Sequence, residues 1–171
     1  MTFNYPQRRS IRLPRFDYSC HGVYFVTIDT FDRNCIFGDV RNEVMIKNKF
    51  GSIADNCWRN IPSHFPNTDL LDYIVMPNHI HGVIVIRNKA GAACCAPTGN
   101  RRHGPAKGSL GAIVRSFKSA VTKTINVDNL IIWPVWQRGY YDRIIRNAKE
   151  LKYVIEYIRT NPTNWNKEAG D

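Results

Sequence analysis

The stretch LLDYIVMPNHIHGVIVIR, residues 70–87, carries the clearest structural signal in the chain. Its two apolar runs, 70–76 and 79–87, are rich in Ile and Val, which favour β-strands. Pro77 and Asn78 separate the runs, and this dipeptide is typical of a tight turn. The stretch therefore predicts an antiparallel β-hairpin with two histidines at the start of its second strand.

The segments around this hairpin alternate between the periodicities of strands and helices. Residues 24–28 (YFVTI) are aromatic and β-branched and predict a central strand. Residues 44–60 have apolar side chains three and four apart, which indicates a helix with one packed face. Ser109 is expected to cap a further helix that runs to about residue 126. The hairpin is thus expected to belong to a sheet with helices packed against it.

The last third of the chain predicts one more strand and one more helix. Residues 136–145 mix aromatic and branched side chains as a strand does, and the helix at 148–161 is expected to stop at Pro162. The order strand, helix, strand, strand, helix, strand indicates an α+β fold with a ferredoxin-like, or RRM-like, antiparallel sheet (βαββαβ). The added C-terminal helix carries Tyr157 near its end.

The chain is strongly basic, with 24 Lys and Arg against 14 Asp and Glu among its 171 residues and a formal net charge of +10. This excess favours a polyanionic partner such as nucleic acid, although a basic surface can also serve solubility alone. We expect one domain over 1–171, with a basic arm at 1–20 and a mobile loop at 88–108. The residues expected to contact phosphates are Arg8, Arg9, Arg12, Arg15, Arg101, Arg102, Lys107, Arg115 and Lys118.

The cysteines and the apolar segments bear on location. The five cysteines include no Cys-x-x-Cys pair, which favours a reducing compartment over a disulfide framework or a thiolate zinc site. No segment approaches the roughly 18 apolar residues of a membrane-spanning helix. A cytoplasmic protein without membrane association is therefore expected.

His79 and His81 form the first candidate site. Side chains alternate along a strand, so the two rings share one face with their Cα atoms about 6.6 Å apart, and one metal ion could meet both. Imidazole is a good ligand for divalent metals, and two histidines leave coordination positions open. Taken alone the pattern is weak, because such pairs are often surface or hydrogen-bonded strand residues.

Tyr157 and Asn161 form the second candidate site, on the last predicted helix. They are four residues apart, so they lie one above the other at the margin of its apolar face. A metal ion beside the helix could meet the phenol oxygen and the carboxamide oxygen from one side. The alternative is a partly exposed tyrosine and a polar residue at a helix end.

Several separated motifs together resemble a known family. Residues 73–84, YIVMPNHIHGVI, resemble the HUH signature of the single-tyrosine (Y1) transposases of the IS200/IS605-like superfamily. Residues 136–142, WQRGYYD, and 157–162, YIRTNP, are similar to the strand and nucleophile helix of the REP-associated tyrosine transposases within it. The arm with 9–14, RSIRLP, and the strand with 24–27, YFVT, are similar too, so the resemblance covers most of the chain.

The resemblance implies roles for individual residues. His79 and His81 match the metal-binding histidines, Tyr157 the nucleophile and Asn161 the third metal ligand, where the insertion-sequence relatives commonly carry glutamine. It implies a Mg²⁺- or Mn²⁺-dependent enzyme that nicks and joins single-stranded DNA bearing a hairpin, through a 5′-phosphotyrosine intermediate. A homodimer is one possible assembly, as in the insertion-sequence relatives.

Alternatives to a tyrosine transposase remain open from the residues themselves. A ferredoxin-like sheet with exposed aromatics also serves as a non-catalytic platform for single-stranded nucleic acid. A metal-dependent hydrolase would use water and leave no protein on the DNA. Tyr153, one turn before Tyr157, is the second candidate nucleophile, and of Tyr140 and Tyr141, which alternate on a predicted strand, one is expected in the core.

Overall fold

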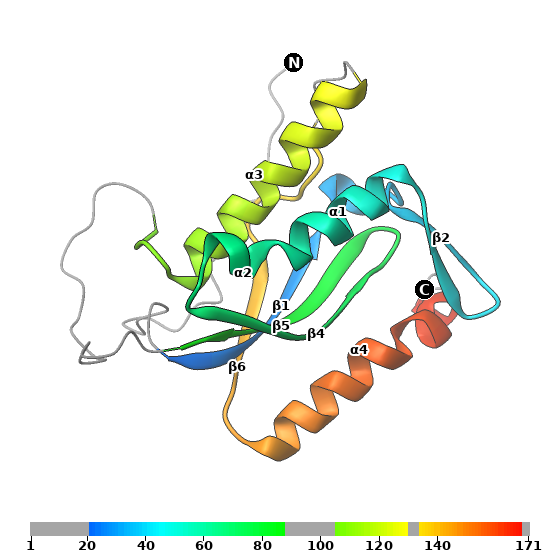
Figure 1. The fold of residues 1–171 in the computed structure, drawn as a ribbon. Helices are drawn as coiled ribbons and strands as arrows, with labels where there is room; N and C mark the ends of the chain where they lie inside the picture. The colour runs from blue at the N-terminus through cyan, green and yellow to red at the C-terminus, as the bar shows by residue number, and fades with distance from the viewer. Residues whose placement is uncertain (1–20, 88–104, 130–133, 169–171) are drawn as a thin grey trace.

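The structure is a computed structural model that describes residues 21–87, 105–129 and 134–168. Its main sheet is antiparallel, with the strand order β4-β5-β1-β6 (Figure 1). The four strands are β1 (Gly22–Asp29), β4 (Thr68–Val75), β5 (His79–Ile86) and β6 (Tyr141–Ile145). With two helices crossing between these strands, this order is that of a ferredoxin-like sheet, so the predicted α+β class is confirmed.

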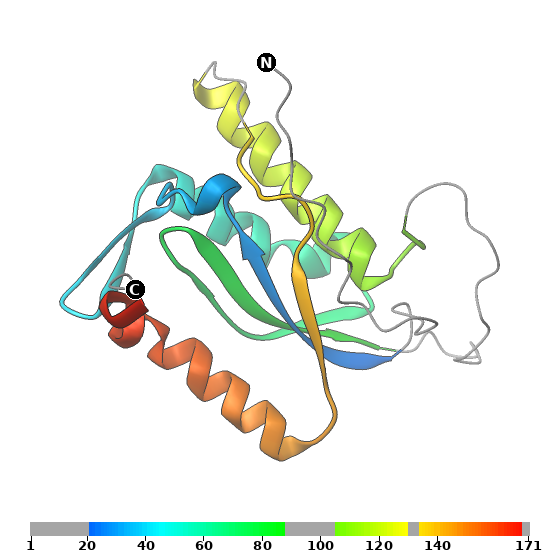
Figure 2. The same ribbon diagram turned by 180° about the vertical axis from the view of Figure 1, so that it is seen from behind.

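Helices cover both faces of this sheet. α1 (Lys49–Arg59), the short α2 (Ile61–His64) and α3 (Leu110–Asn129) lie on one side, and α4 (Ala148–Glu168) lies on the other (Figures 1 and 2). Among the described residues, no helix is both long and apolar enough to span a membrane. The sheet therefore has an α1/α3 face and an α4 face, and each strand contributes side chains to both.

The alternation along β1 separates the two faces. Tyr24, Val26 and Ile28 are fully buried in the main core under α1 and α3. Phe25 belongs to the smaller apolar cluster under α4. The strand predicted at 24–28 is confirmed. Thr27 and Asp29, the polar residues of β1 on the α4 face, line the candidate site described below.

The predicted hairpin of β4 and β5 is also confirmed, and one of its glycines has a clear role. Val75 pairs with Ile80 across the turn, and Gly82 lies on the α1/α3 face beside the indole of Trp58. A Cβ at Gly82 would approach the Trp58 ring to 2.2 Å. Only glycine at this position lets the largest side chain of α1 pack flat on the sheet.

The helix predicted from residue 44 is wrong over its first turn. Residues 44–47 form strand β3 (Val44–Lys47), which pairs with β2 (Gly38–Arg41) in a separate hairpin. The turn is made by Asn42 and Glu43, both with left-handed φ (51° and 63°), the conformation that a tight two-residue hairpin turn requires. The helix begins only after Asn48, whose side chain accepts a hydrogen bond from the Gly51 N–H at 3.0 Å.

The strand predicted at 136–145 is shorter than expected. Trp136 makes one bridge to Thr30, and regular pairing resumes only at β6. Between them Gly139 has a φ of +81°, and the Lys118 ammonium donates to the carbonyl oxygens of Gln137 and Gly139 at 2.6 and 2.8 Å. The Lys118 side chain thus satisfies backbone carbonyl groups that a neighbouring strand would otherwise bond.

The predicted end of the last helix is also wrong, whereas the start of α3 is as predicted. Ser109 Oγ accepts from the Ala112 N–H at 3.3 Å, which confirms the cap. α4, by contrast, continues past Pro162 to Glu168. Proline removes one backbone hydrogen bond, but its φ is compatible with a helix, and the extra turn brings Trp165 to the sheet.

Candidate functional site: two histidines, a tyrosine and a cavity under α4

The two histidines lie side by side on the α4 face of β5. Cross-strand pairing sets His79 opposite Asp29 and His81 opposite Thr27. Only 3% of His79 and 6% of His81 is exposed, and their ring centroids are 4.4 Å apart. The rings therefore converge on one point, as the alternation of the strand predicted.

Hydrogen bonds at Nδ1 orient both rings. Thr27 Oγ1 lies 2.9 Å from His81 Nδ1, and Asn78 Oδ1 lies 2.7 Å from His79 Nδ1. The Asn78 amide oxygen can only accept, so His79 carries its proton on Nδ1 and presents a bare Nε2. That Nε2 is buried and lacks a hydrogen bond of regular geometry among the described residues, while the Asn161 side chain lies close enough to affect the pKa of the ring through a hydrogen bond. Histidines held in this way at Nδ1 are typical of metal sites.

Both rings are neutral at physiological pH. Burial, and secondly the charge of Arg33, lower the pKa of His79 to about 4, against a smaller opposing effect of the Asn161 side chain. Burial, then the neighbouring His79, then Arg33 lower the pKa of His81 to about 3. Neutral imidazole is the form that binds a metal ion, so no proton has to leave at neutral pH.

α4 brings Tyr157 to these rings. The Tyr157 phenol oxygen lies 3.4 Å from His81 Nε2, and the two ring centroids are 5.2 Å apart. An edge-to-face contact with Phe25, at 6.1 Å, fixes the phenol ring from the sheet side. Tyr153, one turn earlier, is 67% exposed. Of the two candidate nucleophiles, Tyr157 is therefore the one that reaches the histidine pair.

Two further side chains on α4 face the same site. Asn161 is buried at 4% exposure, and its side chain acts on the pKa of His79. Trp165 has its ring 6.0 Å from that of His79. Tyr157, Asn161 and Trp165 are spaced by four, so they form a single stripe on the helix. Sequence interpretation missed Trp165 because it ended the helix at Pro162.

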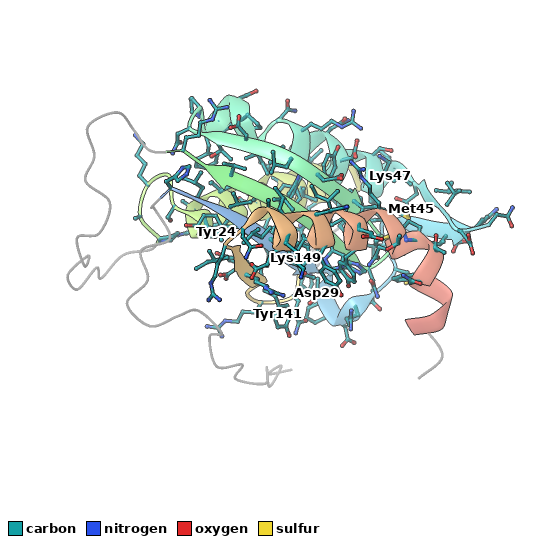
Figure 3. All side chains as sticks on the ribbon, turned by 90° about the horizontal axis from the view of Figure 1, so that it is seen from below. Tyr24, Asp29, Met45, Lys47, Tyr141 and Lys149 are labelled. Carbon is teal, nitrogen blue, oxygen red and sulfur yellow. The ribbon has the colours of Figure 1, made fainter. Side chains whose placement is uncertain are left out.

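The site opens into a cavity of about 590 Å³. The residues that line it are Thr27, Asp29, Asp32, Arg33, His79, His81, Gln137, Tyr141 and Tyr157. Asp29 and Tyr141 are labelled in Figure 3, which looks at the molecule from the α4 side. Tyr140 packs instead on the main core, as expected for one of the two neighbours.

A metal ion fits the donors that meet here. His79 Nε2 is a buried nitrogen acceptor that lacks a hydrogen bond of regular geometry in the described part of the chain, and the His81 ring lies beside it. Within the described ranges, no group of three or more His, Cys, Asp or Glu side chains is arranged to hold a metal. A third protein ligand from this part of the chain would thus be of another type, and the Asn161 carboxamide is well placed.

Several lining residues gave no signal in the sequence. Thr27, Asp29 and Arg33 precede the histidines by some fifty residues, and only the β1–β5 register sets the first two beside them. The alternation of residues 24–28 could have placed Thr27 on the face opposite Val26, but not next to His81. Strand pairing is non-local and cannot be read from one segment.

The predicted phosphate contacts are scattered. Arg8, Arg9, Arg12, Arg15, Arg101 and Arg102, with the arm at 1–20 and most of the loop at 88–108, lie outside the described residues. Lys107 is exposed just before α3, at the end of the sheet where β5 finishes, away from His79. Arg115 is exposed on α3, across the sheet from α4. Lys118 uses its ammonium on backbone carbonyls, which lowers its availability for phosphate.

The chain has the fold of a tyrosine transposase. It is similar to a structure of a REP-associated tyrosine transposase bound to a REP hairpin, with a TM-score of 0.62 over 92% of this chain and 74% of that chain. The two are 16% identical, so the likeness is one of fold. No protein-family model matches the chain.

A sequence relative supplies the family. A protein of Haemophilus influenzae strain Rd, described as an uncharacterized protein, is 40% identical over 165 residues. The match covers 94% of this chain and 91% of the relative. The chain therefore belongs to the same family as this Haemophilus protein, and the two have nearly the same extent.

Proposed function

We propose that this protein cuts and rejoins single-stranded DNA with Tyr157 as its nucleophile. The observation that carries the proposal is the 3.4 Å approach of the phenol oxygen to His81 Nε2, between residues 76 positions apart. A phenol brought to a buried pair of neutral histidines is an arrangement that a structural tyrosine does not need. The pair and the phenol belong to one chain, so the proposed site requires no residue from a second copy.

The fold and the charge support DNA as the substrate. The neighbour of similar fold is a tyrosine transposase bound to a REP hairpin. This chain has a net charge of +10, as expected for a protein that neutralises phosphates. We infer a single strand with a hairpin as its partner.

We infer that His79, His81 and Asn161 hold a divalent metal, Mg²⁺ or Mn²⁺. When bound, such an ion supplies positive charge to a non-bridging phosphate oxygen and stabilises the charge that develops during transfer. The chain contributes the orientation of the donors, because Thr27 and Asn78 fix the two rings at Nδ1. Burial keeps both rings unprotonated.

The chemical step is an exchange of phosphate esters. The Tyr157 phenol loses its proton as its oxygen forms a bond to phosphorus, the bond from phosphorus to the 3′-oxygen breaks, and the departing 3′-oxygen takes up a proton. The products are a 5′-phosphotyrosine and a free 3′-OH. Rejoining is the reverse, in which a 3′-OH attacks the tyrosyl phosphate and the phenol leaves, so the bond energy is conserved and no ATP is consumed.

An adduct assay tests the proposal. End-labelled DNA hairpins with randomised single-stranded flanks are incubated with the protein and Mn²⁺ or Mg²⁺, and the products are separated on a denaturing gel. We expect protein-linked label with the wild type and with the control Tyr153→Phe, and none with Tyr157→Phe. The Phe variant removes one oxygen from a half-buried ring, so its melting temperature should change little.

The other outcomes identify the competing functions. Cleavage without protein-linked label would mean a water-using hydrolase. Metal-independent binding of the hairpins without cleavage would mean a single-stranded nucleic-acid-binding module. An adduct that survives in Tyr157→Phe would exclude Tyr157 as the nucleophile.

A further inference from the structure

Arg33 is a cavity residue that neither the sequence motifs nor the proposed chemistry uses. It ends the short helix η1 (Phe31–Arg33), directly after β1, and its side chain is 69% exposed. It lines the same cavity as His79, His81 and Tyr157. It is also the one lysine or arginine among the described residues that line this cavity.

The backbone at Arg33 is strained and firmly held. Asp32 and Arg33 have φ values of 54° and 52°, a left-handed conformation that costs non-glycine residues of the order of 1 kcal/mol each. Thr30 ties this segment to the turn before His79, because its N–H donates to the Asn78 carbonyl oxygen at 2.9 Å and its hydroxyl lies between the carbonyl oxygens of Asn34 and Asn78, at 2.8 and 2.9 Å. Arg33 N–H in turn donates to the Thr30 carbonyl oxygen at 3.2 Å. The strained turn therefore has a fixed position relative to the histidine strand.

The guanidinium of Arg33 is not held in a tight ion pair. Its acidic neighbour is Asp29, with a nitrogen–oxygen separation of 3.9 Å. This is the outer limit of an ion pair and too long for a hydrogen bond, so the guanidinium is not committed to a tight bidentate pair.

The cavity needs a cation for the substrate proposed above. Two of its lining residues, Asp29 and Asp32, are acidic and repel a phosphate. A guanidinium presents a planar fork of donors that matches two phosphate oxygens, and it stays charged at any pH the protein survives. Among the described lining residues only Arg33 has these properties.

We propose that Arg33 binds the non-bridging oxygens of the scissile phosphate and holds it for attack by the Tyr157 oxygen. This inference rests on the proposed function. Arg33 would then stabilise charge on the phosphate independently of the metal, and its strained turn would serve to aim the guanidinium into the cavity.

The first test compares Arg33→Gln with Arg41→Gln. Arg41 is a matched control, since it is equally exposed at 71% and pairs with Asp39 on β2, away from the cavity lining. We expect the rate of adduct formation at saturating DNA to fall about 100-fold in Arg33→Gln and to stay at the wild-type value in Arg41→Gln. Arg33→Lys keeps the charge without the fork and should give an intermediate rate. A wild-type rate in Arg33→Gln would overturn the inference.

The second test locates the contact without chemistry. The scissile phosphate is first mapped with the wild type and then replaced by an uncharged methylphosphonate. Binding of both DNAs is measured with EDTA present, to Tyr157→Phe protein and to the double variant that also carries Arg33→Gln. If Arg33 contacts that phosphate, the methylphosphonate and Arg33→Gln remove the same contact. Together they should then weaken binding no more than either does alone. Losses of binding free energy that add would overturn the inference.

Different results would contradict the proposed function and the role of Arg33. An absence of wild-type adduct on every hairpin would remove the proposed function and this inference with it. A normal adduct in the wild type with equal rates in Arg33→Gln would remove the inference alone. Melting temperatures of the variants show whether a slow rate reflects unfolding.

Discussion

The two faces of the four-stranded sheet are built by the same strands but packed in different ways. The α1/α3 face is covered by fully buried apolar and aromatic side chains, with the Trp58 ring against Phe117 at 5.1 Å. Among the described residues, the α4 face has a smaller apolar cluster, whose buried members are Val83, Ile145, Val154 and Ile158. Beside that cluster the α4 face buries polar groups. One face therefore supplies the hydrophobic stabilisation and the other holds the candidate site.

The polar groups on the α4 face are expensive to bury. His79 Nε2 lacks a hydrogen bond of regular geometry among the described residues, and an unsatisfied buried nitrogen costs of the order of 1–3 kcal/mol. Asp29 and Asn161 are also almost fully buried there. Within the described part of the chain the α1/α3 face also buries an unpartnered atom, Trp58 Nε1, so it is the gathering of several polar side chains at one place on the α4 face that supports their role in binding and chemistry.

The largest predicted effect is the difference in stability between alanine variants of two tryptophans, one on each face of the sheet. Trp58→Ala should lower the free energy of unfolding by about 3–5 kcal/mol, because the ring is fully buried against Tyr73 and Phe117. Trp165→Ala, beside His79 and partly exposed, should cost less than half as much. Urea denaturation of both variants measures the difference. Equal losses would mean that the α4 face contributes as much stability as the other.

A smaller effect on stability is expected from metal binding, and it should depend only on residues of the α4 face. Mn²⁺ at 100 times its Kd should stabilise the protein by about 2.7 kcal/mol, seen as a higher melting temperature. His79→Gln should abolish the shift, and His64→Gln, at an exposed histidine on α2, should retain it.

The same measurement has a defined pH dependence. Protonation competes with metal only below the pKa of a ligand, and the pKa values of about 4 for His79 and about 3 for His81 are both lowered. The Mn²⁺-induced shift should thus be equal at about pH 7.5 and about pH 6 and decline only as the pH approaches 4. A decline near pH 6.5, the ordinary pKa of histidine, would show that the rings are not desolvated.

The smallest effect is expected from a single hydroxyl on β1. Thr27→Val keeps the shape of the side chain but removes the oxygen that lies 2.9 Å from His81 Nδ1. Loss of such an orienting group typically weakens metal affinity about 10- to 100-fold, and Thr27→Ser should restore it. Titration calorimetry with Mn²⁺ measures the affinity, and a wild-type value in Thr27→Val would contradict an orienting role.

Local patterns predicted much of the fold and the centre of the site. The β4–β5 hairpin, the strand of Tyr24 and the capped start of α3 follow from periodicity and turn residues, and the structure has them. The predictions failed where a distant contact outweighs a local rule. α4 continues through Pro162, and residues 44–47 leave their helical pattern to pair with β2.

The sequence by itself determined which residue types this protein has for chemistry. The two-residue period of a strand sets His79 and His81 on one face, and the helical period sets Tyr157 above Asn161, because both spacings are properties of the local backbone. Only the tertiary structure decided that the two pairs meet. It also brought Thr27, Asp29 and Arg33 to the same cavity, since strand pairing and helix docking depend on contacts between residues far apart in the chain.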